Sequence, residues 1–127
     1  MIEEGKALFL QIAESVEDSI VDGSLPEDSR APSTNELAAF YRINPATAAK
    51  GVNMLVDKGV LVKRRGIGMF VAVGARDQLR SERRAAFADR YIQPLLAEAR
   101  TLGLSPEELA QLVRERASRP HTEGTTR

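Results

Sequence analysis

Two short segments in the middle of the chain carry residues whose types and spacing fit contacts with the phosphates and bases of a nucleic acid. The first is residues 45–58, where small or apolar residues recur at i, i+3, i+4 and i+7 and predict a helix with one inward stripe. This stripe consists of Ala48, Gly51, Val52 and Leu55. Short side chains let a helix backbone approach base edges closely, so the opposite face is suited to a DNA groove. That face carries Ala46, Thr47, Ala49, Lys50 and Asn53.

The second segment is a predicted β-hairpin with a basic tip. The runs 60–64 and 69–73 are β-branched and apolar, and the connection between them contains Gly66 and Gly68. This Gly-x-Gly lacks the following helix of a dinucleotide site and the Lys-Ser/Thr of a triphosphate loop, so we interpret it as a tight turn. The turn would also let the backbone come close to DNA. Its charge comes from Lys63, Arg64 and Arg65.

The charges are distributed unevenly although they sum to zero, with 18 basic and 18 acidic residues. Residues 1–41 contain nine acidic and two basic residues, whereas residues 42–65 contain six basic and one acidic. Such a chain can present one basic face to phosphates and keep its acidic residues elsewhere. On charge alone, an ordinary solvated patch is an equally good interpretation.

Helix signals before these segments predict the elements that position them. Apolar residues at helical spacing predict a first helix over residues 6–22. Ser33 and Glu36 form a capping-box pattern that begins a second helix ending near Tyr41, and Asn44-Pro45 has the form of the next helix start. The result is two helices separated by a tight turn. We assign three aromatic residues to the core: Phe40, Tyr41 and Phe70.

From residue 75 the composition changes to that of amphipathic helices. The pattern predicts a long helix with a kink at Pro94, and then a second helix that begins with a capping box at Ser105. Two helices with one apolar stripe each must bury it on the first module or on a second copy. Dimerisation through this tail is the simpler arrangement. The residues expected to contribute are Leu79, Phe87, Tyr91, Leu95, Leu102, Leu109, Leu112 and Val113.

The predicted fold class is mainly α with a small β-hairpin. We expect a winged helix-turn-helix DNA-binding domain in residues 1–74, a two-helix C-terminal dimerisation hairpin in 75–119, and a disordered tail in 120–127. A chain of 127 residues has no room for a second full-sized domain.

Several other classes of protein are disfavoured. Cysteine is absent and the one histidine, His121, lies in the polar tail, so we expect no metal site and no cofactor. No nucleophile with a base and no acid pair is recognisable, which argues against an enzyme. The acidic start and the lack of an 18-residue apolar run argue against a secretory signal and a membrane span. We therefore expect a cytoplasmic protein.

Four motifs in one order give the chain a resemblance to a known family. Residues 32–38, 44–47, 55–61 and 64–71 look like parts of the DNA-binding domain of the GntR family, and the resemblance covers residues 7–73 nearly without gaps. The short two-helix tail resembles that of the YtrA subfamily.

The resemblance implies a homodimeric transcription regulator, commonly a repressor, that binds a pseudo-palindromic operator of a transport-related operon or of its own gene. Many members have Arg where this chain has Asn35, which can still donate to a phosphate or read adenine. We expect helix-terminal, turn, helix-face and hairpin residues to contact the DNA. They are Ser33, Thr34, Asn35, Arg42, Asn44, Thr47, Lys50, Arg64, Arg65, Gly66 and Gly68.

Two other hypotheses remain. The winged helix could serve protein–protein association without touching DNA, which predicts no salt-dependent affinity for a duplex. Alternatively, the protein could be a sensor for an unidentified small-molecule effector, with a pocket between the tail and the DNA-binding domain.

Overall fold

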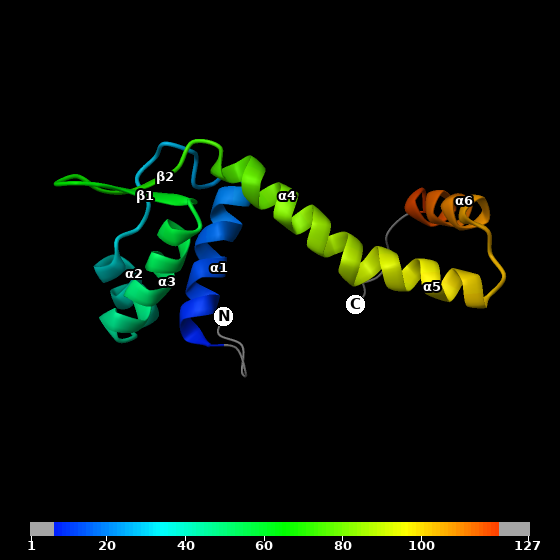
Figure 1. Ribbon diagram of the computed structural model, residues 1–127, viewed down its shortest axis with the longest axis horizontal. Helices are drawn as coiled ribbons and strands as arrows, with labels where there is room; N and C mark the ends of the chain where they lie inside the picture. Colours follow the sequence, from blue (N-terminus) through cyan, green and yellow to red (C-terminus); the bar gives the residue numbers. More distant parts are fainter. Residues whose placement is uncertain (1–6, 120–127) are drawn as a thin grey trace. The chain divides into compact units, whose positions relative to one another are not determined.

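The computed structural model describes residues 7–119, which fall into two compact units with a boundary between Arg83 and Arg84 (Figure 1). The boundary expected from the sequence, after residue 74, lies earlier. The first unit also includes the start of helix α4 (Ala75–Phe87), because Ala75 and Leu79 are buried in its core. The predicted disordered tail, 120–127, lies outside the described residues.

Three helices form the body of the first unit: α1 (Leu8–Val21), α2 (Thr34–Tyr41) and α3 (Pro45–Asp57). Helices α1 and α2 both pack against α3. The predicted inward stripe of α3 is confirmed, since all four of its residues are buried. At Gly51 the helices approach so closely that a β-carbon would lie 2.8 Å from the carbonyl oxygen of Phe9.

A left-handed glycine turns the chain from α3 into the sheet. Gly59 has a φ of 85°, and the backbone N–H of Val60 donates to the carbonyl oxygen of Leu55 at 2.9 Å. Strand β1 (Leu61–Arg64) then pairs antiparallel with β2 (Gly68–Val71). The predicted hairpin is therefore confirmed, and the fold is a winged helix-turn-helix.

The loop before α2 extends this small sheet. The backbone N–H of Asp28 donates to the Val71 carbonyl oxygen at 2.8 Å, and that of Ala31 donates to the Met69 carbonyl oxygen at the same distance. An antiparallel bridge joins Arg30 to Phe70 between these bonds. Residues 28–31 thus cover the side of β2 that faces away from β1.

Ion pairs hold the start of α4 on the rest of the first unit. The ammonium of Lys58 lies 2.7 Å from a Glu17 carboxylate oxygen and 2.8 Å from one of Glu82, and Arg83 pairs with Asp18 at 2.6 Å. Partial burial by itself lowers the pKa of Lys58, but its hydrogen bonds to the two glutamates outweigh this and raise that pKa.

The second unit contains a π-helical segment, η1 (Ala88–Ile92), followed by α5 (Gln93–Thr101) and α6 (Pro106–Ala117). The π-helical segment ends at Ile92, two residues before Pro94, and the kink expected at this proline stays a prediction. Proline has no N–H to donate, so the normal hydrogen-bond ladder cannot continue through it. Ala99 and Leu109 are the buried residues of the described part of this unit.

Both predicted capping boxes are present, one in each unit. The Glu36 N–H donates to the Ser33 hydroxyl at 3.0 Å and the Ser33 N–H donates to the Glu36 carboxylate at 2.8 Å. The corresponding distances for Ser105 and Glu108 are 3.1 and 2.8 Å. Local hydrogen bonds therefore fix where α2 and α6 begin.

Within residues 7–119, no helix is long and apolar enough to cross a membrane. No group of three potential ligands among His, Cys, Asp and Glu is arranged to hold a metal ion in this range.

Candidate nucleic-acid interface

The outer face of α3 is exposed and carries no acidic residue before its last turn. Ala46, Lys50 and Asn53 are exposed, and Thr47 is half-buried at the side of the helix. Asn44 caps the helix, because its side-chain oxygen accepts a hydrogen bond from the Ala46 N–H at 2.7 Å. This oxygen is therefore occupied, and only the amide N–H₂ of Asn44 remains to donate to a phosphate.

Lys50 lies against a neighbouring helix rather than standing alone. Its ammonium is 4.1 Å from the centre of the Phe9 ring at the start of α1. An exposed contact of this kind contributes about 0.5–1 kcal/mol, which a base or phosphate contact can outweigh. The ring thus restrains Lys50 without removing it from the exposed face.

The start of α2 presents Ser33, Thr34 and Asn35 on one turn. The hydroxyl oxygen of Ser33 accepts the capping bond, and its proton interacts with the Glu36 carboxylate, so an anion would have to compete with Glu36 for it. The Ser33 backbone N–H also donates to Glu36, and chiefly for this reason the pKa of that carboxyl lies below its usual range. The unpaired backbone N–H groups at a helix start attract phosphates. Here the Glu36 carboxylate already lies at that position.

The turn between α2 and α3 adds an exposed arginine, Arg42, to the candidate interface. Arg42 is exposed and has a left-handed backbone, with φ of 57°. The Ile43 N–H closes the turn by donating to the Ala38 carbonyl oxygen at 3.0 Å. The predicted tight turn is thus present, with the side chain of Arg42 in solvent.

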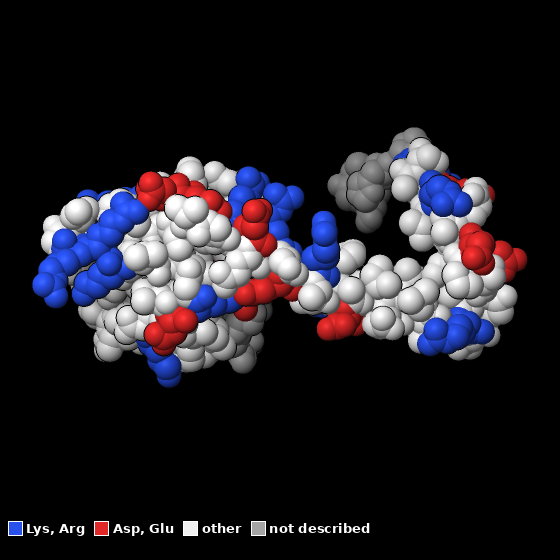
Figure 2. Space-filling view, turned by 45° about the horizontal axis from the view of Figure 1, so that its top comes forward, with Lys and Arg blue, Asp and Glu red and all other residues white. Residues whose placement is uncertain are grey.

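The wing, defined as β1, β2 and the turn between them, carries an exposed basic tip. Figure 2 shows Lys and Arg gathered over this end of the molecule, on the left. Lys63 and Arg65 are exposed, and within residues 7–119 neither forms an ion pair. The backbone at Gly66 and Gly68 has positive φ, as the predicted turn requires.

Arg64 differs from these two cations. It forms an ion pair with Asp28 in the loop before α2, and its guanidinium lies 4.1 Å from the centre of the Phe70 ring. Both partners belong to the wing or to the loop that covers it. The position therefore suits a residue that rigidifies the wing as well as one that contacts DNA.

Two further basic residues change the charge expected on the DNA-facing side of the first unit. Lys58, one of the six basic residues in 42–65, is neutralised by Glu17 and Glu82.

Arg30 adds a cation that the charge count of residues 42–65 does not include. It lies beside the wing, with its guanidinium about 3.4 Å from where a β-carbon on Gly68 would be. Arg30 is exposed and forms no ion pair in the described part of the chain. Sequence reasoning overlooked Arg30 because it lies in the acidic half of the chain, and only the strand-like pairing of its loop could have indicated it.

The structure corrects or refines three aromatic assignments. Phe40 was expected in the core but is 77% exposed, because α2 directs Leu37 and Ala38 inward instead. Tyr41 is half-buried, and its hydroxyl lies 2.7 Å from the hydroxyl of Ser15 on α1. Phe70 is also half-buried, beneath Arg64.

The expected dimerisation residues divide into two groups. Leu79 is 1% exposed and belongs to the core of the first unit, so its place among contact residues is a correction. Leu109 is 7% exposed and is buried in the second unit. The remaining residues keep large apolar side chains exposed. They are Phe87, Tyr91, Leu95, Leu102, Leu112 and Val113.

Comparisons with known proteins agree with this geometry. The family described as bacterial regulatory proteins, gntR family, matches residues 8–71. The transcriptional repressor YtrA of Bacillus subtilis is 24% identical over 108 residues, which cover 85% of this chain and 82% of the repressor.

Two solved structures are similar as well. A transcriptional regulator assigned to the GntR family, from Bacteroides thetaiotaomicron, is 32% identical, with a TM-score of 0.71 over 87% of this chain and 96% of the other. The N-terminal domain of AraR, solved in complex with a mutant of ORR3, is 30% identical with a TM-score of 0.52. The match covers 55% of this chain and all of that domain.

Proposed function

The chain belongs to the GntR family of DNA-binding transcription regulators, and we propose that it acts as a homodimeric repressor of a transport-related operon or of its own gene. The name of YtrA supports the repressor role, and the similar DNA-binding domain of AraR, solved in complex with operator ORX1, supports an operator as the ligand. The target DNA would be pseudo-palindromic, with one half-site for each copy.

The observation that carries this proposal is the basic wing beside an exposed helix face. Lys63 and Arg65, which form no ion pair with the residues that the structure describes, would contact the phosphate backbone. The face of α3 with Thr47 and Lys50 would enter the major groove, where Lys50 reads a base. Arg42 and Ser33 would hold the phosphates on either side of that groove.

Exposed apolar side chains in the second unit are the reason to propose a dimer. Phe87, Tyr91 and Leu95 follow one another at four-residue spacing, and the first two rings have centroids 5.4 Å apart. Exposed apolar side chains in a row on one helical face are most stable when a second apolar face covers them. A second copy of the same chain supplies such a face through twofold symmetry.

A gel-shift titration with the DNA upstream of the protein's own gene tests the DNA-binding part. We expect Lys50→Ala to weaken operator binding by roughly 1–3 kcal/mol if its ammonium reads a base. Arg65→Ala should instead reduce the slope of log affinity against log salt by about 1, because one phosphate contact is lost. The control is Arg116→Ala, which removes an exposed cation of α6.

The result would contradict the proposal if both variants bound this DNA as the unaltered protein does. Affinity for a duplex that did not change with salt would favour the protein–protein hypothesis. Footprinting on the same DNA should show two protected half-sites about one helical turn apart.

A further inference from the structure

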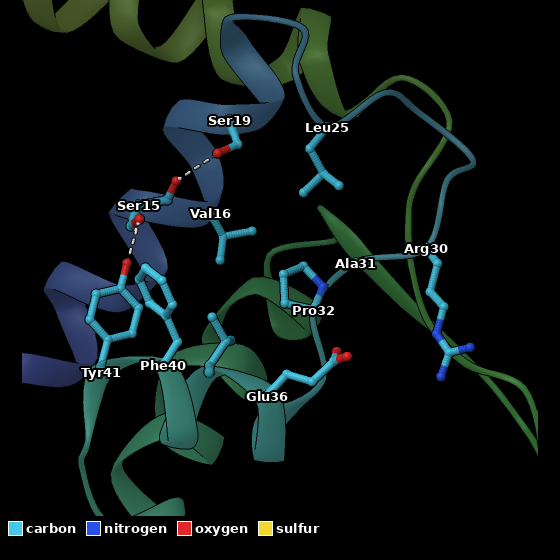
Figure 3. Close-up of a pocket in the computed structure, with 11 residues that line it drawn as sticks. Ser15, Val16, Ser19, Leu25, Arg30, Ala31, Pro32, Glu36, Phe40 and Tyr41 are labelled. Carbon is cyan, nitrogen blue, oxygen red and sulfur yellow. Dashed lines mark hydrogen bonds between the residues drawn. The ribbon is translucent and has the colours of Figure 1, made fainter.

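A pocket of roughly 810 Å³ lies inside the first unit, between α1, the loop before α2, and α2 itself (Figure 3). Its volume falls in the range of about 300–1,000 Å³ that is usual for small-molecule sites. All of its lining residues come from the winged-helix unit. The pocket is thus distinct from the one hypothesised between the tail and the DNA-binding domain.

The base of the pocket is apolar and continuous with the core. Val16, Ala31 and Leu37 line it and are each less than 8% exposed, and Leu25 closes it from the loop side. Phe40 stands at the rim with 77% of its surface exposed, whereas Leu37 of the same helix is buried. A planar apolar molecule on this ring would remove that surface from water.

One polar group in the wall can orient such a molecule. The hydroxyls of Ser15 and Tyr41 lie 2.7 Å apart, and Figure 3 shows the pair at one side of the pocket. Two hydroxyls carry two protons and their mutual bond uses one, so one proton remains for an acceptor. The described residues provide no acceptor for it. At the other end of the pocket, Arg30 and Glu36 bring opposite charges, which disfavours a strongly charged ligand.

We propose that this pocket binds a small uncharged aromatic molecule with an acceptor oxygen on its ring system, such as a phenol or an aromatic carbonyl compound, and that the ligand regulates operator binding. The rings would lie between Phe40 and the apolar base, and the oxygen would accept from the Ser15–Tyr41 pair. The binding part stands on the pocket alone, whereas the regulatory part rests on the proposed function.

The position of the pocket gives the ligand a direct path to the DNA-contacting residues. The molecule would touch α1 and α2 together, and α2 carries the Ser33 turn at its start and packs on α3. A change in the spacing of α1 and α2 would move that turn relative to Lys50. By thermodynamic reciprocity, the operator and the ligand must change each other's affinity by the same factor.

The binding experiment uses the full chain and the uncharged fluorescent probe 6-propionyl-2-(dimethylamino)naphthalene, which has aromatic rings and a carbonyl oxygen that can accept a hydrogen bond. We expect saturable binding with amide NMR shifts in residues 15–41. The double variant Ser15→Ala with Tyr41→Phe should weaken it about fivefold to tenfold, because the donor is lost while the aromatic ring stays. Phe40→Ser should weaken it about tenfold, and this exposed position should not disturb folding.

The matched control is Phe87→Ser, which removes an equally large and 55% exposed ring from the second unit. Its probe affinity at residues 15–41 should equal that of the unaltered protein. Shifts confined to residues 87–113, or equal affinities for all variants, would overturn the ligand site. A loss of self-association in Phe40→Ser would also overturn it, because this face would then be a protein contact.

The regulatory part is tested by repeating the gel shift with saturating probe. We expect operator affinity to change at least fivefold, with a smaller change at the same probe concentration in the Phe40→Ser variant. An unchanged affinity in the presence of bound probe would overturn the regulatory role. This outcome is distinct from failure of the proposed function, since operator binding is measured first without the probe.

Discussion

The two units of the chain bury apolar residues to very different extents. In the first unit, α1, α2, α3, both strands and the start of α4 contribute to one core, and Ile12, Leu55 and Val60 are at most 1% exposed. The described part of the second unit buries only Ala99 and Leu109, while six large apolar residues stay exposed. Both units nevertheless contain regular helices with well-formed starts.

This difference shows that good helix signals and a sufficient core are separate properties. Capping boxes and helical spacing define α6 as sharply as α2, but they supply only local hydrogen bonds. Most of the stability of a helix in a protein comes from packing its apolar face. The first unit satisfies this within one chain, whereas the second, on our proposal, requires another copy.

The largest expected effect comes from truncating the core of the first unit. Leu55→Ala should lower the free energy of unfolding by about 2–5 kcal/mol, because Leu55 is 1% exposed and its loss leaves a cavity. Leu112→Ala, at a 40% exposed position of α6, should cost less than about 1 kcal/mol in dilute protein. Urea unfolding followed by circular dichroism measures both. Equal losses would remove the contrast between the units.

The next effect concerns association. Tyr91→Ser with Leu95→Ser should raise the dissociation constant of the dimer by at least about tenfold, because large side chains at the centre of an interface contribute most of its energy. Sedimentation equilibrium measures this constant, and Arg116→Ala serves as the control. Unaltered protein that stayed monomeric at high concentration would contradict the role we propose for the exposed tail residues.

A smaller effect compares the same local motif in the two units. Ser33→Ala and Ser105→Ala should each cost about 1 kcal/mol, since each removes the oxygen that caps the third N–H of its helix. Ser33→Ala should additionally weaken operator binding, whereas Ser105→Ala should leave it unchanged. Thermal unfolding and gel shifts separate the two roles. Equal operator affinities would confine Ser33 to capping.

The smallest effect is a dependence of stability on pH at Glu36. Its pKa is lowered from an ordinary value of 4.5, chiefly because the Ser33 backbone N–H donates to the carboxylate. A lowered pKa in the folded state means that the stabilisation is present above about pH 4.5 and is lost as the pH falls through the folded value. Glu36→Gln should therefore flatten the melting temperature between about pH 3 and 6. An unchanged pH profile in this variant would assign the dependence to other carboxylates.

Much of the first unit could be predicted from the sequence, because its signals are local. The α3 stripe, both capping boxes, the tight turn and the glycine-containing hairpin each depend on residues within a few positions of one another. The face of α3 with Lys50 follows directly from the stripe opposite it. For the same reason the winged-helix fold could be assigned before the structure.

The features that escaped prediction depend on residues far apart in the chain. The pairing of Arg64 with Asp28 and of Lys58 with Glu17 requires the tertiary fold, so charge counting could not separate occupied cations from available ones. Helical spacing placed Phe40 and Leu79 on apolar stripes, but spacing alone does not reveal which other helix or strand packs against each stripe. Phe40 proved exposed and Leu79 proved buried in the first unit.

The pairing of residues 28–31 with β2 affects how readily the wing could pair with a strand of another molecule. A two-stranded ribbon has two open edges, and each can recruit a strand from another molecule and start an aggregate. Among residues 7–119, the loop occupies the edge of β2 and leaves that of β1 open. Lys63, which forms no ion pair with the described residues, lies on that strand, where the same charge on an approaching ribbon would repel it. A cation that suits a phosphate contact would thus also hinder strand pairing between the wings of two molecules.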